Sequence, residues 1–167
     1  MISTLLIIFA VLAANWVLPL VFCWAYVLLA WKVMEDVTFI GRHGLFAMFK
    51  LDELGLVPWH ARLWKDWGGV GLMGFMVFRN HPGKWDDAWV ARTKMHEGEH
   101  CRHWFWLGAM FYVSYLLHMA FIYFFQKDKH PYLDCWSERL ARKKAGQQLD
   151  FTPAEWPQGE NDRWPWW

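Results

Sequence analysis

The sequence predicts a mainly α-helical, membrane-associated protein, in which an N-terminal transmembrane helix precedes a compact helical core with one or two short strands. Three observations predict this class. Residues 1–31 contain no charged side chain, hydrophobic residues make up 56% of the chain, and 15 of the 167 residues are Trp. Trp concentrates at the boundary between lipid and water, because its ring is apolar while its N–H is polar. The chain length leaves room for one domain after the helix.

The segment 1–31 is the expected membrane anchor. A bilayer core is crossed by roughly 20 apolar residues in a helix, and Asn15 and Pro19 do not forbid a span, because transmembrane helices tolerate kinks. A cleaved signal peptide is the rival interpretation. Against it, no basic segment precedes the apolar stretch and no small-residue cleavage site precedes Lys32. Basic residues follow the anchor, so the positive-inside rule predicts a cytoplasmic main domain.

Charge and cysteine content exclude several classes of protein. The formal net charge is +1 and the basic residues are scattered along the chain, so nucleic acid is not an expected partner. The three cysteines are odd in number and lack the short spacing of metal ligands, so they predict neither a disulfide framework nor a zinc ribbon. The lipid bilayer is the partner that the composition predicts.

Turn residues divide the remainder of the chain. Residues 72–78 are apolar and bounded by turn residues, which predicts a buried strand. A helix is expected over residues 88–107. A second helix is expected over residues 132–145, because Gly146 follows it and basic residues occupy its last turn. The tail, residues 151–167, contains three Pro and four Trp residues, which excludes regular helix and favours contact with a membrane surface.

Two histidines on the first of these helices have the spacing of metal ligands. His96 and His100 are four residues apart, so on a helix they share one face and both imidazoles can reach one tetrahedral metal ion. Glu97 lies beside such an ion, where its carboxylate can take a proton from a metal-bound water. The alternative is a polar helix whose histidines are ordinary surface or core residues.

Residues 96–100 read HEGEH and resemble the HExxH motif of the zincin metallopeptidases. The resemblance covers about residues 71–142, and it implies a Zn²⁺ ion with Glu97 as the general base. Zincin sites need a third protein ligand, which leaves a fourth position for water. Residues 137–142 resemble the second-helix segment of the glutamate-liganded zincins, which implies Glu138 as that third ligand.

Three further side chains are candidates near this site. Asp134 lies one helical turn before the implied third ligand, as a substitute for it or as a partner that orients a ligand. His103 shares the helical face of His96 but is about 10 Å from it along the axis, so one ion hardly binds both. Glu99 adds a second acid on the other flank of the histidines.

Gly98 departs from the usual pattern, because Gly inside a helix costs about 1 kcal/mol relative to Ala. No Tyr or His stands out as an oxyanion stabiliser.

The uncharged run over residues 103–126 has a geometric consequence. As one straight transmembrane helix it would be about 35 Å long and would place the third ligand across the membrane from the two histidines. A shared metal ion and a straight span are therefore incompatible. Gly108 offers a place to bend, so segment 104–126 is expected to form an apolar hairpin or to lie at the interface, within a metal-binding domain over residues 32–150. Basic residues flank the run on both sides and mark neither side as external.

The leading interpretation is therefore a membrane-anchored zinc hydrolase with peptidase-like chemistry, acting on a peptide or protein substrate. One alternative is a non-enzymatic small membrane protein with a structural or lysis-related role, in which no metal co-purifies and Glu97→Gln has no consequence. Another is a histidine-rich membrane di-iron oxidoreductase. His96, His100 and His103 offer one cluster of that kind, whereas such enzymes need several.

Overall fold

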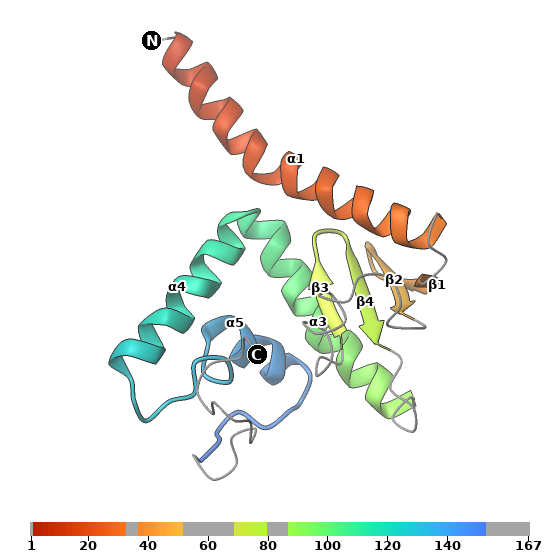
Figure 1. The fold of residues 1–167 in the computed structure, drawn as a ribbon, viewed down its shortest axis with the longest axis vertical. Coiled ribbons are helices and arrows are strands. Elements are labelled where there is room, and N and C mark those ends of the chain that lie inside the picture. Colours follow the sequence, from red (N-terminus) through yellow and green to blue (C-terminus); the bar gives the residue numbers. More distant parts are fainter. Residues whose placement is uncertain (1, 33–36, 52–68, 80–86, 153–167) are drawn as a thin grey trace.

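The protein is mainly helical, with a small open sheet. The computed structural model describes residues 2–32, 37–51, 69–79 and 87–152 (Figure 1). The helices within these ranges are α1 (Ile2–Lys32), α3 (Asp87–Leu107), α4 (Met110–Phe125) and α5 (Trp136–Lys144). The predicted helix over residues 88–107 is confirmed as α3. The predicted tail falls almost entirely on residues 153–167, which lie outside the described ranges.

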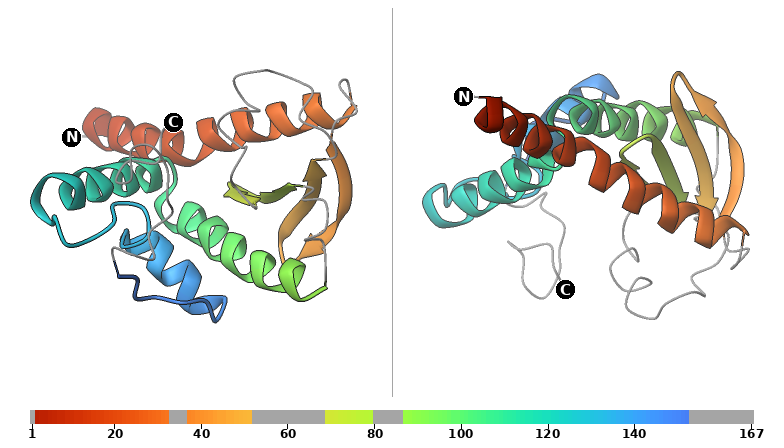
Figure 2. Two further views of the ribbon diagram at one scale, coloured as in Figure 1. Left: turned by 60° about the horizontal axis from the view of Figure 1, so that its bottom comes forward. Right: turned by 90° about the horizontal axis from the view of Figure 1, so that it is seen from above.

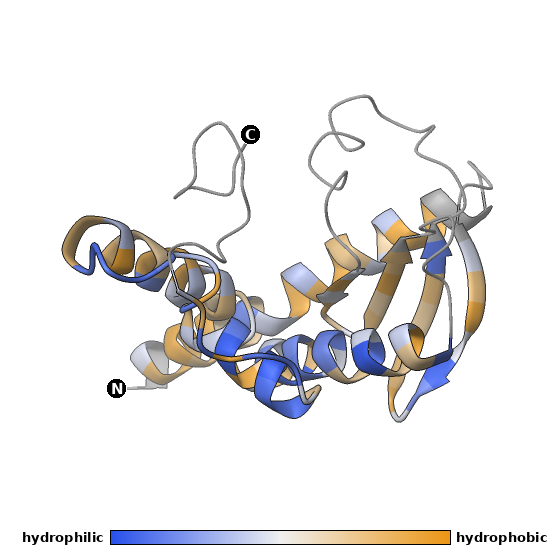
Figure 3. Cartoon of the chain, turned by 90° about the horizontal axis from the view of Figure 1, so that it is seen from below, coloured by the Kyte–Doolittle hydropathy of each residue, from blue (hydrophilic) through white to orange (hydrophobic). Residues whose placement is uncertain are grey.

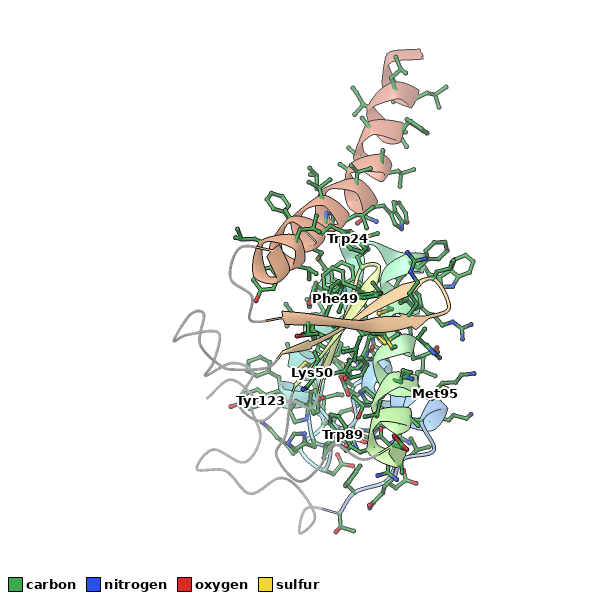
Figure 4. The ribbon with its side chains drawn as sticks, turned by 90° about the vertical axis from the view of Figure 1, so that its right-hand side faces the viewer. Trp24, Phe49, Lys50, Trp89, Met95 and Tyr123 are labelled. Atoms are coloured by element: carbon green, nitrogen blue, oxygen red, sulfur yellow. The ribbon has the colours of Figure 1, made fainter. Side chains whose placement is uncertain are left out.

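Helix α1 is long and apolar enough to cross a membrane. The qualifying stretch is Thr4–Leu29, although a signal sequence or an apolar core helix would meet the same criteria. The helix continues through Pro19, and most of its apolar side chains are exposed, Phe9 at 72%. Near its C-terminal end it packs on the sheet, where Val27 is buried. Figure 4 shows Trp24 on the side of α1 that meets the sheet.

Four short strands form the sheet in the order β1-β2-β4-β3. Two antiparallel hairpins supply them, and β2 pairs with β4 in parallel. The strands are β1 (Val37–His43), β2 (Phe46–Leu51), β3 (Gly69–Leu72) and β4 (Phe75–Arg79). The sequence predicts only one or two strands, because Gly and charged residues interrupt the apolar pattern of β1 and β2. The core of the sheet consists of fully buried apolar side chains, among them Phe49, Phe75, Met76 and Phe78.

The predicted single strand over residues 72–78 is wrong. The chain reverses at Gly74, whose φ of +92° is a conformation that L side chains rarely adopt, and the two halves pair as β3 and β4. Apolar residues lie on both sides of this turn, so the hydrophobic pattern alone reads as one continuous strand. The hairpin places β3 at the edge of the sheet, in contact with α3.

Helices α3 and α4 form a bent pair. Their directions differ by 113°, and the break lies at Gly108 with φ of +58°. The bend that the sequence predicts at Gly108 is therefore confirmed. Helix α5 lies in the angle between α3 and α4 (Figure 1), so the chain returns to α3 after the apolar helix.

Helix α5 begins later than the sequence predicts. The predicted start is residue 132, whereas the helix starts at Trp136. The residues before it form turns, in which the backbone N–H of His130 donates to Oδ2 of Asp134 at 2.9 Å. A carboxylate that binds nearby backbone N–H groups favours a turn over a helix, which accounts for the difference.

Candidate metal centre

Two helices bring together three buried side chains that can hold a metal ion. His96 and His100 come from α3 and Glu138 comes from α5. One ligand atom from each residue lies within 4.8 Å of the other two. Only 9%, 7% and 2% of the three residues' surfaces are exposed. Buried ionisable side chains are held in proteins by pairing with one another or with a metal ion.

The ligand atoms form a small triangle. The two imidazole Nε2 atoms are 3.2 Å apart. Nε2 of His96 is 3.3 Å from Oε2 of Glu138, and Nε2 of His100 is 3.2 Å from Oε1 of the same carboxylate. Both Nε2 atoms therefore face the carboxylate and each other.

The local sequence explains this convergence. The four-residue spacing puts His96 and His100 on one face of α3, and the 113° bend returns the chain so that α5 packs against that face. Glu138 lies in the first turn of α5, where the helix dipole favours a negative charge. The bend and the helix start together position the carboxylate.

The remaining ring nitrogens of the two histidines are held by polar side chains. Nδ1 of His96 lies 2.8 Å from Oε1 of Gln147, and Nδ1 of His100 lies 3.0 Å from Oγ of Ser137. Such contacts fix the orientation of an imidazole and leave Nε2 directed at the centre. The sequence did not indicate Ser137 or Gln147. The only signal for Ser137 is its position next to Glu138.

The Glu138 carboxylate receives one hydrogen bond from α4. The hydroxyl of Tyr115 donates to Oε1 at 2.9 Å. The other oxygen, Oε2, is buried and meets the geometric criteria for no hydrogen bond among the described residues, although Nε2 of His96 lies 3.3 Å from it. A buried carboxylate needs a positively charged partner, which either a protonated His96 or a cation at the centre would supply. The donor set thus fits a metal ion on an observation independent of the HEGEH sequence.

Electrostatics couple the carboxylate to the imidazoles. Burial by itself would raise the pKa of Glu138, but the charges of His100 and His96 hold it well below its ordinary value. Burial by itself would lower the pKa of His96, but the hydrogen bond with Glu138 and the negative charges of Glu97 and Glu138 raise it to about 8. The carboxylates therefore favour the protonated, positively charged form of His96.

Glu97 lies beside the triangle, between α3 and the edge strand β3. It is buried, and burial raises the pKa of its carboxyl, although His100 and His96 and a backbone hydrogen bond from Gly71 oppose that shift. The backbone approaches closely here, because a Cβ atom on Gly71 would overlap the carbonyl oxygen of Glu97 and would lie 2.8 Å from Cβ of His100. Gly71 therefore allows β3 to lie directly against the motif.

The other predicted candidates lie around the triangle but do not join it. Nδ1 of His103 lies 2.9 Å from Oγ of Ser137, which links His103 to His100 through a shared hydroxyl. Glu99 faces Arg102 at 3.4 Å on the other flank of the helix. Asp134 pairs with Arg139 at 3.1 Å and holds the turn before α5.

Three protein ligands from two helices leave a further position at a metal ion for water or substrate. The buried group formed by His96, His100 and Glu138 can therefore hold a metal ion. Comparisons with protein-family models, with curated proteins and with solved structures found no match to this chain.

Proposed function

We propose that the protein is a membrane-anchored zinc-dependent hydrolase with peptidase-like chemistry. His96, His100 and Glu138 would hold the Zn²⁺ ion, and Glu97 would act as the general base. The observation that carries the proposal is the convergence of two imidazole Nε2 atoms on one buried carboxylate. Tetrahedral zinc with bonds of about 2.0–2.1 Å sets its ligand atoms about 3.3–3.4 Å apart. Here the two Nε2 atoms are 3.2 Å apart, close to that spacing, and each lies 3.2–3.3 Å from a different oxygen of the Glu138 carboxylate.

The resemblance of residues 96–100 to the zincin motif supports zinc over other metals. Zinc bound at such a site lowers the pKa of a bound water towards about 7 and polarises a carbonyl group. Imidazole and carboxylate are ligands that zinc accepts, and a structural zinc site would instead be closed by four protein side chains. The three-membered set therefore favours a catalytic role.

The environment of Glu97 supports its role as the proton acceptor. A general base works best when its pKa lies near the working pH, and burial moves the pKa of Glu97 upward from its ordinary value. Its carboxylate would accept a proton from the water that attacks the peptide carbonyl, and it would then donate this proton to the leaving amine. The hydrogen bond from Gly71 and the packing against β3 would hold it in place.

The exposed apolar surface of α1 supports the membrane anchor. We infer a cytoplasmic main domain from the basic residues after the anchor, and substrates that are peptides or proteins near the membrane surface. A non-enzymatic membrane protein is the alternative. A non-enzymatic protein would require neither a bound zinc ion nor Glu97 as a base.

The test separates metal binding from chemistry. The full chain, purified in detergent and loaded with zinc, is assayed on a library of fluorogenic peptides beside Glu97→Gln and Glu99→Gln. We expect Glu97→Gln to keep its zinc and to lose about 10²-fold or more in kcat. Glu99 lies on the same helix but outside the triangle, so Glu99→Gln should retain both its zinc and its kcat. Equal hydrolysis by all three proteins would contradict the role of Glu97, and a zinc-loaded chain that cleaves nothing would favour the non-enzymatic alternative.

A further inference from the structure

Asn15 joins α1 to the bend between α3 and α4. Its side-chain Nδ2 donates to the carbonyl of Leu107 at 2.9 Å, and its Oδ1 accepts from the N–H of Met110 at 3.2 Å. These are a carbonyl at the end of α3 and an N–H at the start of α4, which have no partner within their own helices. One amide therefore satisfies both sides of the break.

The backbone of Asn15 takes part as well. Its carbonyl accepts a hydrogen bond from the N–H of Ala109 at 2.8 Å. In an uninterrupted helix this carbonyl would bind the N–H of residue 19, but Pro19 has no N–H to donate. The proline in α1 therefore frees a carbonyl that the bend of the other helices uses.

The contact is too close for any residue but glycine at the bend. A Cβ atom on Gly108 would overlap both the side-chain nitrogen and the carbonyl oxygen of Asn15. Next to it, the indole N–H of Trp16 donates to the carbonyl of Phe105 at 3.0 Å. Four polar groups of the broken helix pair thus find partners in α1 and need no water, which is the condition for a helix break inside a bilayer.

The surface around this bend is apolar. Residues 103–126 carry no charged side chain. Figure 3 shows hydrophobic residues along α4, while α5 is mainly hydrophilic. Figure 2 shows α4 and the N-terminal half of α1 at the same end of the molecule, away from the sheet. Large apolar side chains stand exposed here, including Phe105, Trp106, Met110, Leu117, Phe124 and Phe125.

We propose that the bend between α3 and α4 is a re-entrant membrane segment that enters the acyl-chain region of a bilayer beside α1 and returns to the same side. Helix α4 has 16 residues. It is about 24 Å long, which is shorter than a hydrocarbon core of about 30 Å. Charged residues flank both ends of the uncharged run, Arg102 on α3 and Lys127 after α4, so both ends stay in water. The occupant of the exposed apolar surface is lipid.

The location of Asn15 agrees with this placement. It lies within Thr4–Leu29, about 16 Å along the helix from Thr4, so its polar contacts with the bend are made inside the apolar stretch. His100 lies eight residues before Gly108, about 12 Å along α3. The metal centre would then stand at the lipid–water boundary, within reach of membrane-associated peptides. The inference rests on the membrane anchor of the proposed function and is independent of zinc.

Photo-cross-linking tests the placement. Four positions are replaced one at a time by p-benzoylphenylalanine in the full chain, which is reconstituted in phosphatidylcholine–phosphatidylglycerol vesicles, irradiated and analysed by mass spectrometry. Trp106 and Leu117 test the bend and α4, and Phe9 on α1 tests the anchor. Leu140 on α5, an apolar side chain that is 46% exposed, is the matched control. We expect lipid adducts at Trp106, Leu117 and Phe9 and none above background at Leu140.

The other outcomes overturn the inference in distinguishable ways. Lipid adducts at Phe9 but not at Trp106 and Leu117 would refute the re-entrant segment and leave the anchor standing. An absence of adducts at all three positions would refute the anchor as well. Adducts to a second protein chain at Trp106 or Leu117 would assign the apolar surface to an interface between copies.

Discussion

Nε2 of His100 lies 3.2 Å from Oε1 of Glu138, although an apolar helix and a sharp bend separate the two residues along the chain. The contact exists because α4 turns back at Gly108 and α5 then packs on α3. The candidate metal centre therefore depends on the bend, and the bend depends on Asn15 in the N-terminal helix. These dependences lead to separate predictions.

Gln147 orients His96, so its loss should weaken zinc binding. Gln147→Ala removes the partner of Nδ1 while leaving all three proposed ligands in place. Loss of such an orienting partner reduces metal affinity by about 10–100-fold. Zinc affinity is measured by competition with a chromophoric chelator. Gln148→Ala is the control. Gln148 is the next residue along the chain and its side chain is exposed, so this variant should bind zinc as the unmodified protein does. Equal affinities in the two variants would show that Gln147 does not position the ligand.

Asn15 should stabilise the whole fold through the bend. Asn15→Ala leaves the carbonyl of Leu107 and the N–H of Met110 without their partner, at a cost of about 1–3 kcal/mol in the free energy of unfolding. Ser114→Ala serves as the control, because its hydroxyl donates to the carbonyl of Phe111 within its own helix. Denaturation in mild detergent compares the two. A loss no larger for Asn15→Ala than for Ser114→Ala would refute the role of Asn15.

Two glycines with similar backbone angles separate strain from crowding. Gly108 has φ of +58° and Gly146 has φ of +65°, but only a Cβ on Gly108 would meet other atoms. Alanine in this conformation costs about 1–2 kcal/mol at either position, and the overlap with Asn15 adds about 1–3 kcal/mol at Gly108 alone. Unfolding measurements on the metal-free proteins should therefore rank Gly108→Ala as clearly less stable than Gly146→Ala. Equal losses of stability in the two variants would show that Gly108 does not lie against Asn15 of α1.

The metal-free protein should lose stability at alkaline pH. The pKa of His96 is raised from 6.5 to about 8, so the folded state holds this proton more tightly than the unfolded state. The resulting stabilisation is complete below pH 6.5 and disappears as the pH rises through about 8, with a size of about 2 kcal/mol. Unfolding is measured between pH 6 and pH 9 in the presence of a chelator. The decline should be smaller in His96→Gln, and an identical decline in both proteins would exclude His96 as its source.

Part of this arrangement is predictable from the sequence, because some of its signals are local. The spacing of His96 and His100 on one helix is such a signal. So is the bend at Gly108, which follows from requiring that Glu138 and the histidines lie on one side of an apolar run. The anchor-like character of α1 is evident from the absence of charge in residues 1–31.

The remainder depends on contacts between distant segments. The β3–β4 hairpin escapes detection because apolar residues flank Gly74 on both sides, and the late start of α5 follows from the turn that Asp134 holds. Tyr115 and Gln147 reach the triangle only after the helices have packed. The hydrogen bonds of Asn15 could not be foreseen either, since a polar residue in an apolar helix does not indicate which segment it binds.

The most direct test of the central claim is the zinc content of the purified chain. The full-length protein and its His96→Ala, Glu138→Ala and Glu99→Gln variants are stripped of metal in detergent, reloaded with zinc, freed of excess ion and analysed by mass spectrometry. We predict about one zinc per chain in the unmodified protein and in Glu99→Gln, and close to none in the other two. No zinc in the unmodified protein, or equal zinc in all four, would contradict a centre formed by His96, His100 and Glu138.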